Sequence, residues 1–389
     1  MKVQVLSWTS GDEELEEEKE FFVNMFGKTE DGKSVCVTVP YLPWFCIEKT
    51  QKRGGVSSLF ELRQLYNDEE FYFPKPEKET LIKREKFYGF NNQELCDFYK
   101  LRFNTRGKWY RAAKAIEERR AKNNKNYTLY ESNVEPVLKF IHDMDMETTG
   151  WIEVNKYVEI NESMEEDEVI QPLDERILCK MEDINVLDIQ ETAPFVIASF
   201  DIETYSPDGS FPDPERKGCE VIQIAVTFQK AGEEKSYKKV LLNLGTCDEI
   251  EDVELHTFKT EKDLLNYFPK VIHKEKTDCL LGYNIWGFDL WYMWKRAEMI
   301  GADEFFYLSK IDEPCELKFS KFSSSAYGDN DYKMVPTPGI FQLDLLVVVK
   351  RDHKLDSYKL DNVSEHFLGE KKVDLSPKEM FAKYKGTSA

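Results

Sequence analysis

Alternating apolar and polar positions in the first fifty residues predict β-strands. Residues 3–8 (VQVLSW) alternate, and the apolar runs 21–27 and 34–40 flank the polar segment TEDGK, which predicts a hairpin. Residues 44–48 form a third extended run. Apolar positions at helical spacing predict helices at 56–65 and 108–122 and one beginning near Asn133, followed by a strand at 151–160. This part of the chain is therefore expected to be β-rich with a few helices.

The pattern changes after residue 194. Residues 195–204 (FVIASFDIET) are apolar enough for a central strand, and 221–228 and 237–244 are short strands that suit an antiparallel meander. Thr260 is placed to cap a helix at 262–273, a strand follows at 279–285, and a helix at 286–300 ends before Gly301. This order predicts an α/β layer built on a mixed sheet.

The remaining segments complete the predicted organisation. Residues 315–343 are rich in serine and glycine and predict a long hairpin, and 341–349 is a further apolar run. Helices are predicted at 357–367 and from Ser376 onward, where a proline occupies the first turn. The acidic stretch 161–185 has few large apolar residues and is expected to be flexible. We therefore divide the chain into two domains, residues 1–187 and 188–389.

The amino-acid composition excludes several classes of protein. With 389 residues, 41% of them hydrophobic and 13% aromatic, the chain can bury two or three domain cores, which excludes wholesale disorder. No run approaches the ~20 apolar residues of a membrane span, and the N-terminus lacks a secretory apolar region, so an intracellular protein without membrane partners is expected. The eight cysteines form no CxxC pair and the five histidines show no metal-site spacing, which argues against zinc or a disulfide framework.

The charge is uneven along the chain. The net charge of −20 disfavours nonspecific nucleic-acid binding by the protein as a whole, but residues 81–128 carry thirteen Lys or Arg and only five Asp or Glu. We propose that four of these basic residues face a template backbone or an acidic partner surface: Arg102, Arg106, Lys108 and Arg111. The aromatic residues among them either stack on unpaired bases or pack inside the domain: Phe87, Tyr88, Phe90, Phe98, Tyr99, Phe103, Trp109 and Tyr110.

Three acidic residues are the candidates for chemistry. Asp201 and Glu203 are two positions apart on a strand and project from the same face, while Asp289 is predicted in the first turn of a helix that follows another strand. Such carboxylates suit two Mg²⁺ or Mn²⁺ ions and in-line attack on a phosphodiester. A solvated strand end and an ordinary helix N-terminal charge are the plain alternatives for each residue taken alone.

The segments FDIET and GYNIWGFD resemble the first two exonuclease motifs of family B DNA polymerases, particularly the delta-like enzymes of eukaryotes and large DNA viruses. The segments starting FFVNMFGKTEDGK, LYESNVEPVLKF and FQLDLLVVVKRD are also similar to that family, in the same order. The resemblance implies an RNase H-like exonuclease domain, incomplete at its C-terminus, behind a β-rich α+β domain that helps to hold template. It implies that Asp201, Glu203 and Asp289 bind two Mg²⁺ (or Mn²⁺) ions for 3′→5′ hydrolysis of DNA, while Asn284 and Phe288 shape the site.

The sequence departs from the family pattern in one respect that affects catalysis. The third motif, Tyr-x-x-x-Asp, is not found: Tyr358 is followed three places on by Asp361, and Tyr384 four places on by Ser388. Asp344 is expected in a strand and is the alternative that could be recruited as a ligand, although its counterpart in the family is not one. The polymerase motifs are absent as well, and YGDND at 327–331 is interpreted as a polar hairpin tip.

These departures define the expected partners. The chain resembles the N-terminal part of a polymerase, either a split subunit or a truncated polypeptide, that needs a C-terminal polymerase portion for full exonuclease activity. Primer-template DNA, a single-stranded 3′ end and a sliding clamp are the other partners implied, in a nucleus or a cytoplasmic virus factory. A non-catalytic half that shapes the template path, and an unrelated RNase H-like nuclease, are the alternative functions.

Overall fold

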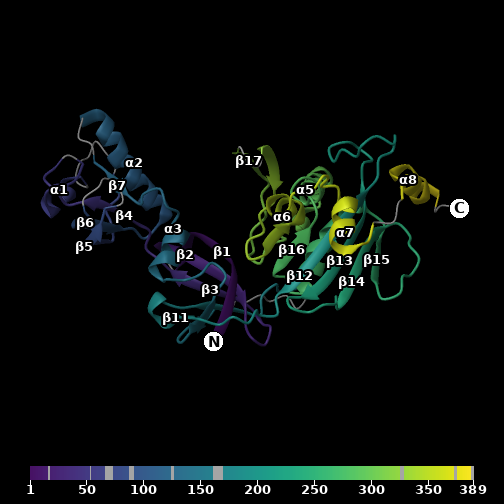
Figure 1. Ribbon diagram of the computed structural model, residues 1–389, viewed down its shortest axis with the longest axis horizontal. Coiled ribbons are helices and arrows are strands. Elements are labelled where there is room, and N and C mark those ends of the chain that lie inside the picture. The colour runs from purple at the N-terminus through teal and green to yellow at the C-terminus, as the bar shows by residue number, and fades with distance from the viewer. Residues whose placement is uncertain are drawn as a thin grey trace.

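The computed structural model describes residues 1–15, 18–52, 54–65, 73–86, 92–123, 127–160, 170–324, 328–371 and 375–386. Figure 1 shows a small lobe, an N-terminal sheet and a larger α/β lobe arranged along the long axis of the molecule. None of the helices in the described part of the chain combines the length and the apolar character that crossing a membrane requires.

The N-terminal sheet has seven strands in the order β11-β8-β1-β2-β3-β10-β9. The predicted hairpin is formed by β2 and β3, and residues from Phe21 to Lys28 are buried because both faces of β2 are covered. Phe140 of α3 packs into the same core. The elements are β1 (Lys2–Leu15), β2 (Glu18–Lys28), β3 (Ser34–Pro40), α3 (Pro136–Asp143), β8 (Trp151–Val154), β9 (Val158–Glu159), β10 (Glu175–Leu178), the short 3-10 helix η1 (Met181–Asp183) and β11 (Ile184–Leu187).

The expectation of a flexible stretch at 161–185 is wrong for its second half. Residues 161–169 lie outside the described residues, but β10 runs parallel to β3 and β11 pairs with β8. Ile177 and Ile184 are buried in the sheet's core. Two well-placed apolar residues anchor this acidic segment in the core, and average composition does not reveal them.

The small lobe contains a four-stranded sheet in the order β5-β6-β4-β7. Burial settles the role of four of the interleaved aromatics: Tyr99, Phe103 and Trp109 pack in the core of this lobe, and Phe98 packs in that of the N-terminal sheet. Tyr110 is exposed, and Phe87, Tyr88 and Phe90 lie outside the described residues. The elements are β4 (Trp44–Glu48), α1 (Leu59–Gln64), β5 (Lys78–Glu85), β6 (Leu95–Arg102), α2 (Arg106–Asn123) and β7 (Leu129–Tyr130).

The α/β lobe is built on a six-stranded mixed sheet in the order β15-β14-β13-β12-β16-β19. The predicted antiparallel meander is β12, β13 and β14, while β16 and β19 extend the sheet parallel to β12. The strands are β12 (Val196–Thr204), β13 (Val221–Lys230), β14 (Lys238–Leu244), β15 (Glu254–Phe258), β16 (Cys279–Gly282) and β19 (Phe341–Asp344).

Helices complete the α/β lobe. Alternate residues of β12, such as Phe200 and Ile202, are buried, and the Phe200 ring lies 5.7 Å from that of Phe268 on α4. The hairpin predicted within 315–343 is formed by β17 and β18. The elements are α4 (Glu261–Lys274), α5 (Asp289–Ile300), the 3-10 helix η2 (Asp303–Phe306), β17 (Lys318–Ser324), β18 (Gly328–Met334), α6 (Leu345–Asp352), α7 (Leu360–Leu368) and α8 (Pro377–Gly386).

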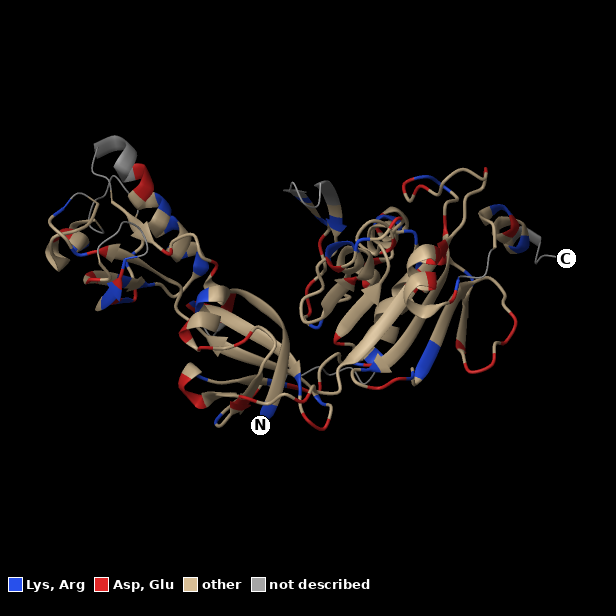
Figure 2. Ribbon diagram, viewed as in Figure 1, with Lys and Arg blue, Asp and Glu red and all other residues tan. Residues whose placement is uncertain are grey.

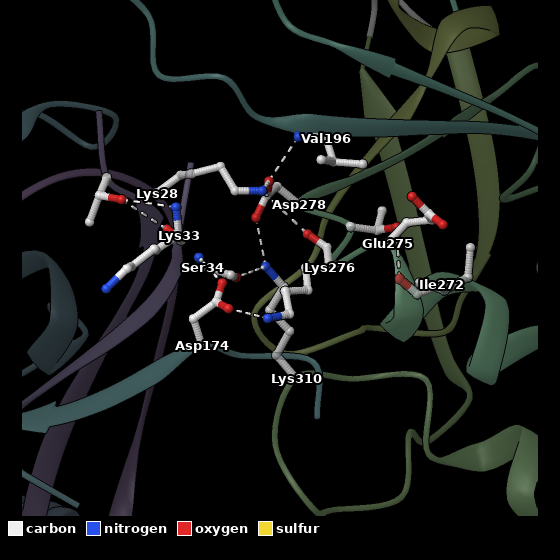
Figure 3. Close-up of polar contacts among 12 residues, drawn as sticks. Lys28, Lys33, Ser34, Asp174, Val196, Ile272, Glu275, Lys276, Asp278 and Lys310 are labelled. Atoms are coloured by element: carbon white, nitrogen blue, oxygen red, sulfur yellow. Dashed lines mark hydrogen bonds and ion pairs between the residues drawn. The ribbon is translucent and has the colours of Figure 1, made fainter. Parts of the chain in front are cut away.

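A buried ionic cluster joins the N-terminal sheet to the α/β lobe (Figure 3). Lys28 of β2 and Lys310 each place Nζ 2.6 Å from a carboxylate oxygen of Asp278, the residue before β16. Lys310 also donates to the Ser34 hydroxyl, and Asp278 accepts from the Val196 amide. The three charged side chains are at most 3% exposed, so dissolved salt screens the attraction between their charges very little.

Candidate functional site

The first part of the site is the end of the central strand β12. Asp201 and Glu203 project from one face of the strand, where Asp201 is exposed and Glu203 half-buried, while Ile202 points into the core. Glu203 lies directly opposite Gln223 of β13. Because β12, β16 and β19 are parallel, their carboxyl ends meet at one edge, where α/β sheets place ligand sites.

The second part is the tight turn from β16 into α5. Asn284 adopts a left-handed conformation (φ 65°), and its carbonyl accepts from the amides of Gly287 and Phe288 at 3.0 Å. At position 287 an added Cβ would lie 2.2 Å from Oδ1 of Asn284, so any larger residue there would displace the Asn284 side chain. This turn shortens the predicted strand, which ends at Gly282, and makes Asp289 the first residue of the helix.

The turn places Asp289 beside β12, the strand that carries Asp201 and Glu203. Its Oδ1 lies 3.3 Å from the backbone nitrogen of Ile202, which sits between Asp201 and Glu203 in sequence. The side chain is only 4% exposed. Burial, and next the negative charge of Asp201, raise the pKa of Asp289 to about 7. The structure therefore brings together the two acidic segments that the sequence placed at separate strand ends.

Asp344, the last residue of β19, has a structural role at the same edge. Its carboxylate accepts hydrogen bonds from the backbone amides of Asn284 (2.8 Å), Trp286 (3.1 Å) and Leu346 (3.0 Å). It thereby caps α6 and fixes the turn that precedes Asp289. With three backbone donors on its two oxygens, Asp344 is poorly suited to bind a metal.

The donor chemistry of the site fits a hard divalent cation. Two carboxylates, Asp201 and Asp289, interact unfavourably, and a cation between them would relieve that repulsion. Within the described residues, however, no three His, Cys, Asp or Glu side chains converge into a complete metal-binding group. Glu203 projects from the same face of β12 as Asp201.

Aromatic side chains cluster around Phe288, the residue before Asp289. The Phe288 ring lies 5.1 Å from that of Tyr292 and 5.8 Å from that of Phe211, which is 80% exposed in the loop between β12 and β13. The sequence named Asn284 and Phe288 as residues that shape the site, which stays a prediction, whereas it gave no expectation for Phe211. A lone aromatic within the polar run SPDGSFPDPERKG was the signal that could have drawn attention to it.

The loop between β12 and β13 is tied to α5, the helix that begins with Asp289. Arg296 donates to the carbonyls of Pro214 (3.1 Å) and Arg216 (3.4 Å) and forms a buried ion pair with Glu261 at 2.5 Å. The Tyr292 hydroxyl donates to the carbonyl of Cys219 at 3.2 Å. We call these contacts of Arg296 and Tyr292 with the loop the Arg296 clamp. It was not predicted from the sequence, because it depends on contacts between segments that are distant in the chain.

The four proposed DNA-contacting residues lie on the small lobe, where Lys and Arg gather along α2 (Figure 2). Arg102 donates to the Thr80 hydroxyl at 2.9 Å, and the Arg111 guanidinium donates to the carbonyl of Gly107 at 3.2 Å. Arg106 pairs with Glu135 at 2.8 Å, and Lys108 with Glu77 at 3.4 Å. These exposed or half-exposed contacts are weak enough to exchange for phosphates, so their role in DNA binding stays a prediction.

Known proteins resemble the chain in both sequence and fold. Residues 127–363 match the family model described as "DNA polymerase family B, exonuclease domain". The chain is 29% identical over 388 residues to a DNA polymerase of Paramecium bursaria Chlorella virus NY2A, covering 97% of this chain and 41% of that protein. It is 30% identical over 378 residues to the DNA polymerase delta catalytic subunit of Dictyostelium discoideum, covering 91% of this chain and 33% of that protein.

The similarity in fold agrees with the similarity in sequence. The structure of the family B DNA polymerase from the hyperthermophilic archaeon Pyrobaculum calidifontis matches with a TM-score of 0.67 and 17% identity, covering 99% of this chain and 42% of that one. At that identity the match shows the fold alone. The chain spans between about a quarter and two fifths of the length of the curated relatives it matches.

Proposed function

Because the chain belongs to the family B DNA polymerases and contains their exonuclease domain, we propose that it forms the N-terminal and proofreading part of a replicative polymerase. The reaction is the hydrolysis of the terminal phosphodiester at a 3′ end of DNA. The contact between Asp289 and the Ile202 amide is the observation that carries the proposal, since it places the second acidic segment against the first.

Asp201, Glu203 and Asp289 would hold two divalent ions, Mg²⁺ or Mn²⁺. These ions would lower the pKa of a water molecule and stabilise the leaving 3′ oxygen. The protein's own contribution is positional. The left-handed turn at Asn284 and the hydrogen bonds to Asp344 hold Asp289 in place, and Ile202 in the core holds the orientation of Asp201 and Glu203.

The third motif's aspartate is not found within residues 1–389, so we propose that a further acidic ligand comes from a polymerase segment outside this sequence. Either the same polypeptide or a partner can supply this segment, provided that it reaches the carboxyl edge of β12. We assign residues 1–187 to template handling and 188–389 to the exonuclease domain. Primer-template DNA is the substrate, a sliding clamp is a further partner, and the site of action is a nucleus or a virus factory.

A divalent-metal assay on 3′-labelled single-stranded DNA tests the proposal. Residues 1–389 alone should hydrolyse the strand slowly, and a polypeptide that carries the missing Tyr-x-x-x-Asp helix should restore the rate. Asp201→Ala should abolish the restored activity, and an RNA strand of the same sequence should be hydrolysed more slowly. Fast hydrolysis by the chain alone, lost in Asp201→Ala, would place the remaining ligand within residues 1–389.

A second candidate function is a non-catalytic half that docks the rest of a polymerase. Exposed apolar side chains at the end of α7 and just before α8 favour it: Phe367 (46% exposed), Leu368 (73%) and Leu375 (46%). If the restored complex binds primer-template but Asp201→Ala leaves its hydrolysis rate unchanged, this second function replaces the first.

A further inference from the structure

A cavity of about 630 Å³ lies between the sheet of the α/β lobe and α8. Its floor is formed by Gln223 of β13 and Asn243 of β14, and Met380, Lys383 and Tyr384 of α8 contribute to its lining. The volume falls within the range of sites for small molecules in proteins. Residues of the proposed metal site are not among the described residues that line it, so the cavity is a separate space.

The cavity adjoins the catalytic edge of the sheet. Glu203 is directly opposite Gln223, and Gln223 is directly opposite Asn243, so the three side chains form a row across one face of β12, β13 and β14. Cross-strand neighbours of this kind have Cβ atoms about 5 Å apart. A molecule bound over Gln223 is therefore next to Glu203.

The floor offers hydrogen-bonding groups of the carboxamide type. Nε2 of Gln223 donates to Oδ1 of Asn243 at 2.8 Å, and Nδ2 of Asn243 donates to the carbonyl of Leu244 at 3.3 Å. Asn243 is 4% exposed, so the pair is fixed in orientation. Among the described residues, none hydrogen-bonds to the oxygen or the second N–H of the Gln223 amide, so both groups are available to a ligand. A carboxamide can donate to and accept from the edge of a nucleobase at the same time.

The α8 side offers a stacking surface and a cation. The Tyr384 ring lies 5.1 Å from the ring of Tyr205, and its hydroxyl donates to Oε2 of Glu220 at 3.3 Å, so two contacts orient the aromatic ring. Met380 adds a polarisable thioether. Lys383 is exposed at the rim and can reach a phosphate.

We propose that this cavity binds a 2′-deoxynucleoside 5′-monophosphate, the product of the hydrolysis in the proposed function, on which this inference rests. The base stacks on Tyr384 and hydrogen-bonds to Gln223, and the phosphate pairs with Lys383. One phosphate is favoured over three, because Lys383 is the one basic side chain among the described residues of the lining and Asp248 adds a negative charge to it.

Mononucleotide binding can be measured without catalysis, in EDTA, by titrating each of the four deoxynucleoside monophosphates into the full chain and following amide chemical shifts. Saturable binding is expected, with the largest shifts at residues 223, 243 and 384. Lys383→Ala should weaken it about tenfold, the loss expected for one charge-assisted hydrogen bond. Gln223→Met, which keeps the volume but removes the amide, should weaken it similarly. Lys378→Ala, on the same helix but outside the cavity, should have no effect.

Several outcomes would overturn the assignment. These are the absence of binding at millimolar concentration, equal affinity of wild type and Lys383→Ala, or tighter binding of a triphosphate than of the monophosphate. Lys383 is an exposed helix residue, so its variant remains decisive if Gln223→Met does not fold. A chain that hydrolyses DNA but binds no mononucleotide refutes the cavity alone. A chain that binds mononucleotide without hydrolysing DNA, even when complemented, refutes the proposed function instead.

Discussion

The backbone nitrogen of Ile202 lies 3.3 Å from Oδ1 of Asp289, so the first carboxylate of α5 is held against the strand that bears Asp201 and Glu203. This contact couples the geometry of the site to its stability. A buried carboxylate beside another is unfavourable for folding unless a cation is bound. Substitutions at this contact, and at the contacts that support it, should therefore change stability and activity in different ways.

Asp289→Asn should stabilise the metal-free protein while abolishing hydrolysis. The folded-state pKa of Asp289 is raised to about 7 from an ordinary value near 4, so its ionisation opposes folding above pH 7 and ceases to matter as the pH falls toward 4. We expect a gain on the order of 1–3 kcal/mol at pH 8 that shrinks at pH 5. Urea unfolding in EDTA at both values measures it. An equal gain at both would mean that Asp289 titrates normally.

Asp344→Ala should destabilise the α/β lobe by roughly 2–4 kcal/mol, because three backbone amides lose their acceptor. Asp344→Asn keeps one acceptor oxygen and should cost less. The same urea experiment compares the two variants, with the exposed Asp361→Asn as a control. If Asp344→Ala unfolds like wild type, the turn before Asp289 is held by other contacts.

Asp278→Ala should cost about 3–5 kcal/mol, since it leaves Lys28 and Lys310 buried without their shared carboxylate. The triple change Lys28→Met, Asp278→Leu and Lys310→Met should cost less than the single one, because no uncompensated charge remains. Lys33→Met, at an exposed pair with Glu175, should change stability by less than about 0.5 kcal/mol. Thermal melting of the four proteins would reject this account if the triple change proved the most damaging.

Lys139 should make stability depend on pH in the alkaline range. Burial lowers its pKa to about 8, and the side chain, 1% exposed, donates to the carbonyl of Trp44. Between pH 8 and about 10.4 the unfolded chain binds the proton more tightly, so stability relative to Lys139→Met should rise with pH, by up to roughly 3 kcal/mol. Comparing the two proteins at each pH cancels contributions from cysteines and tyrosines. A flat difference would show that Lys139 has an ordinary pKa.

Charge reversal at Arg102, Arg106, Lys108 and Arg111 should reduce the salt dependence of single-stranded DNA binding. The slope of log K against log salt becomes shallower by about 0.7 for every phosphate that the protein no longer neutralises, so it should fall by up to about 3. Fluorescence anisotropy across a salt series measures the slope. The control reverses four exposed lysines of the α/β lobe: Lys235, Lys239, Lys259 and Lys262. Equal slopes for wild type and the first variant would remove these residues from the DNA path.

Local pattern was sufficient to predict the elements that carry the acids. The meander of β12, β13 and β14, the capped helix α4 and the position of Asp289 at a helix start follow from periodicity and capping signals. The two-residue spacing of Asp201 and Glu203 fixed their common face. The candidate acids could therefore be assigned to their secondary-structure elements before any tertiary contact was known, and their role stays a prediction.

Other features depend on pairing between distant segments, which local pattern does not contain. β5 is a largely polar strand and β6 a strand with buried aromatic residues, and neither was predicted; β15 was missed because it is a short strand at the edge of the sheet. The segment 341–349 appeared as one apolar run but divides at Asp344, where the carboxylate caps a helix. The Arg296 clamp is likewise invisible in sequence, because its acceptors are backbone carbonyls of another loop.

The ionic cluster of Lys28 and Asp278 joins residues that are 250 positions apart. During synthesis at roughly 5–20 residues per second, the lysine emerges from the ribosome roughly 12–50 s before its counterion exists. Until Asp278 has been synthesised, the Lys28 ammonium group therefore stays solvated on the surface of the N-terminal sheet that later contacts the α/β lobe. Docking of the N-terminal sheet onto the α/β lobe is therefore a late event of biogenesis. A chain truncated before residue 278 should form the N-terminal sheet but leave its docking surface exposed.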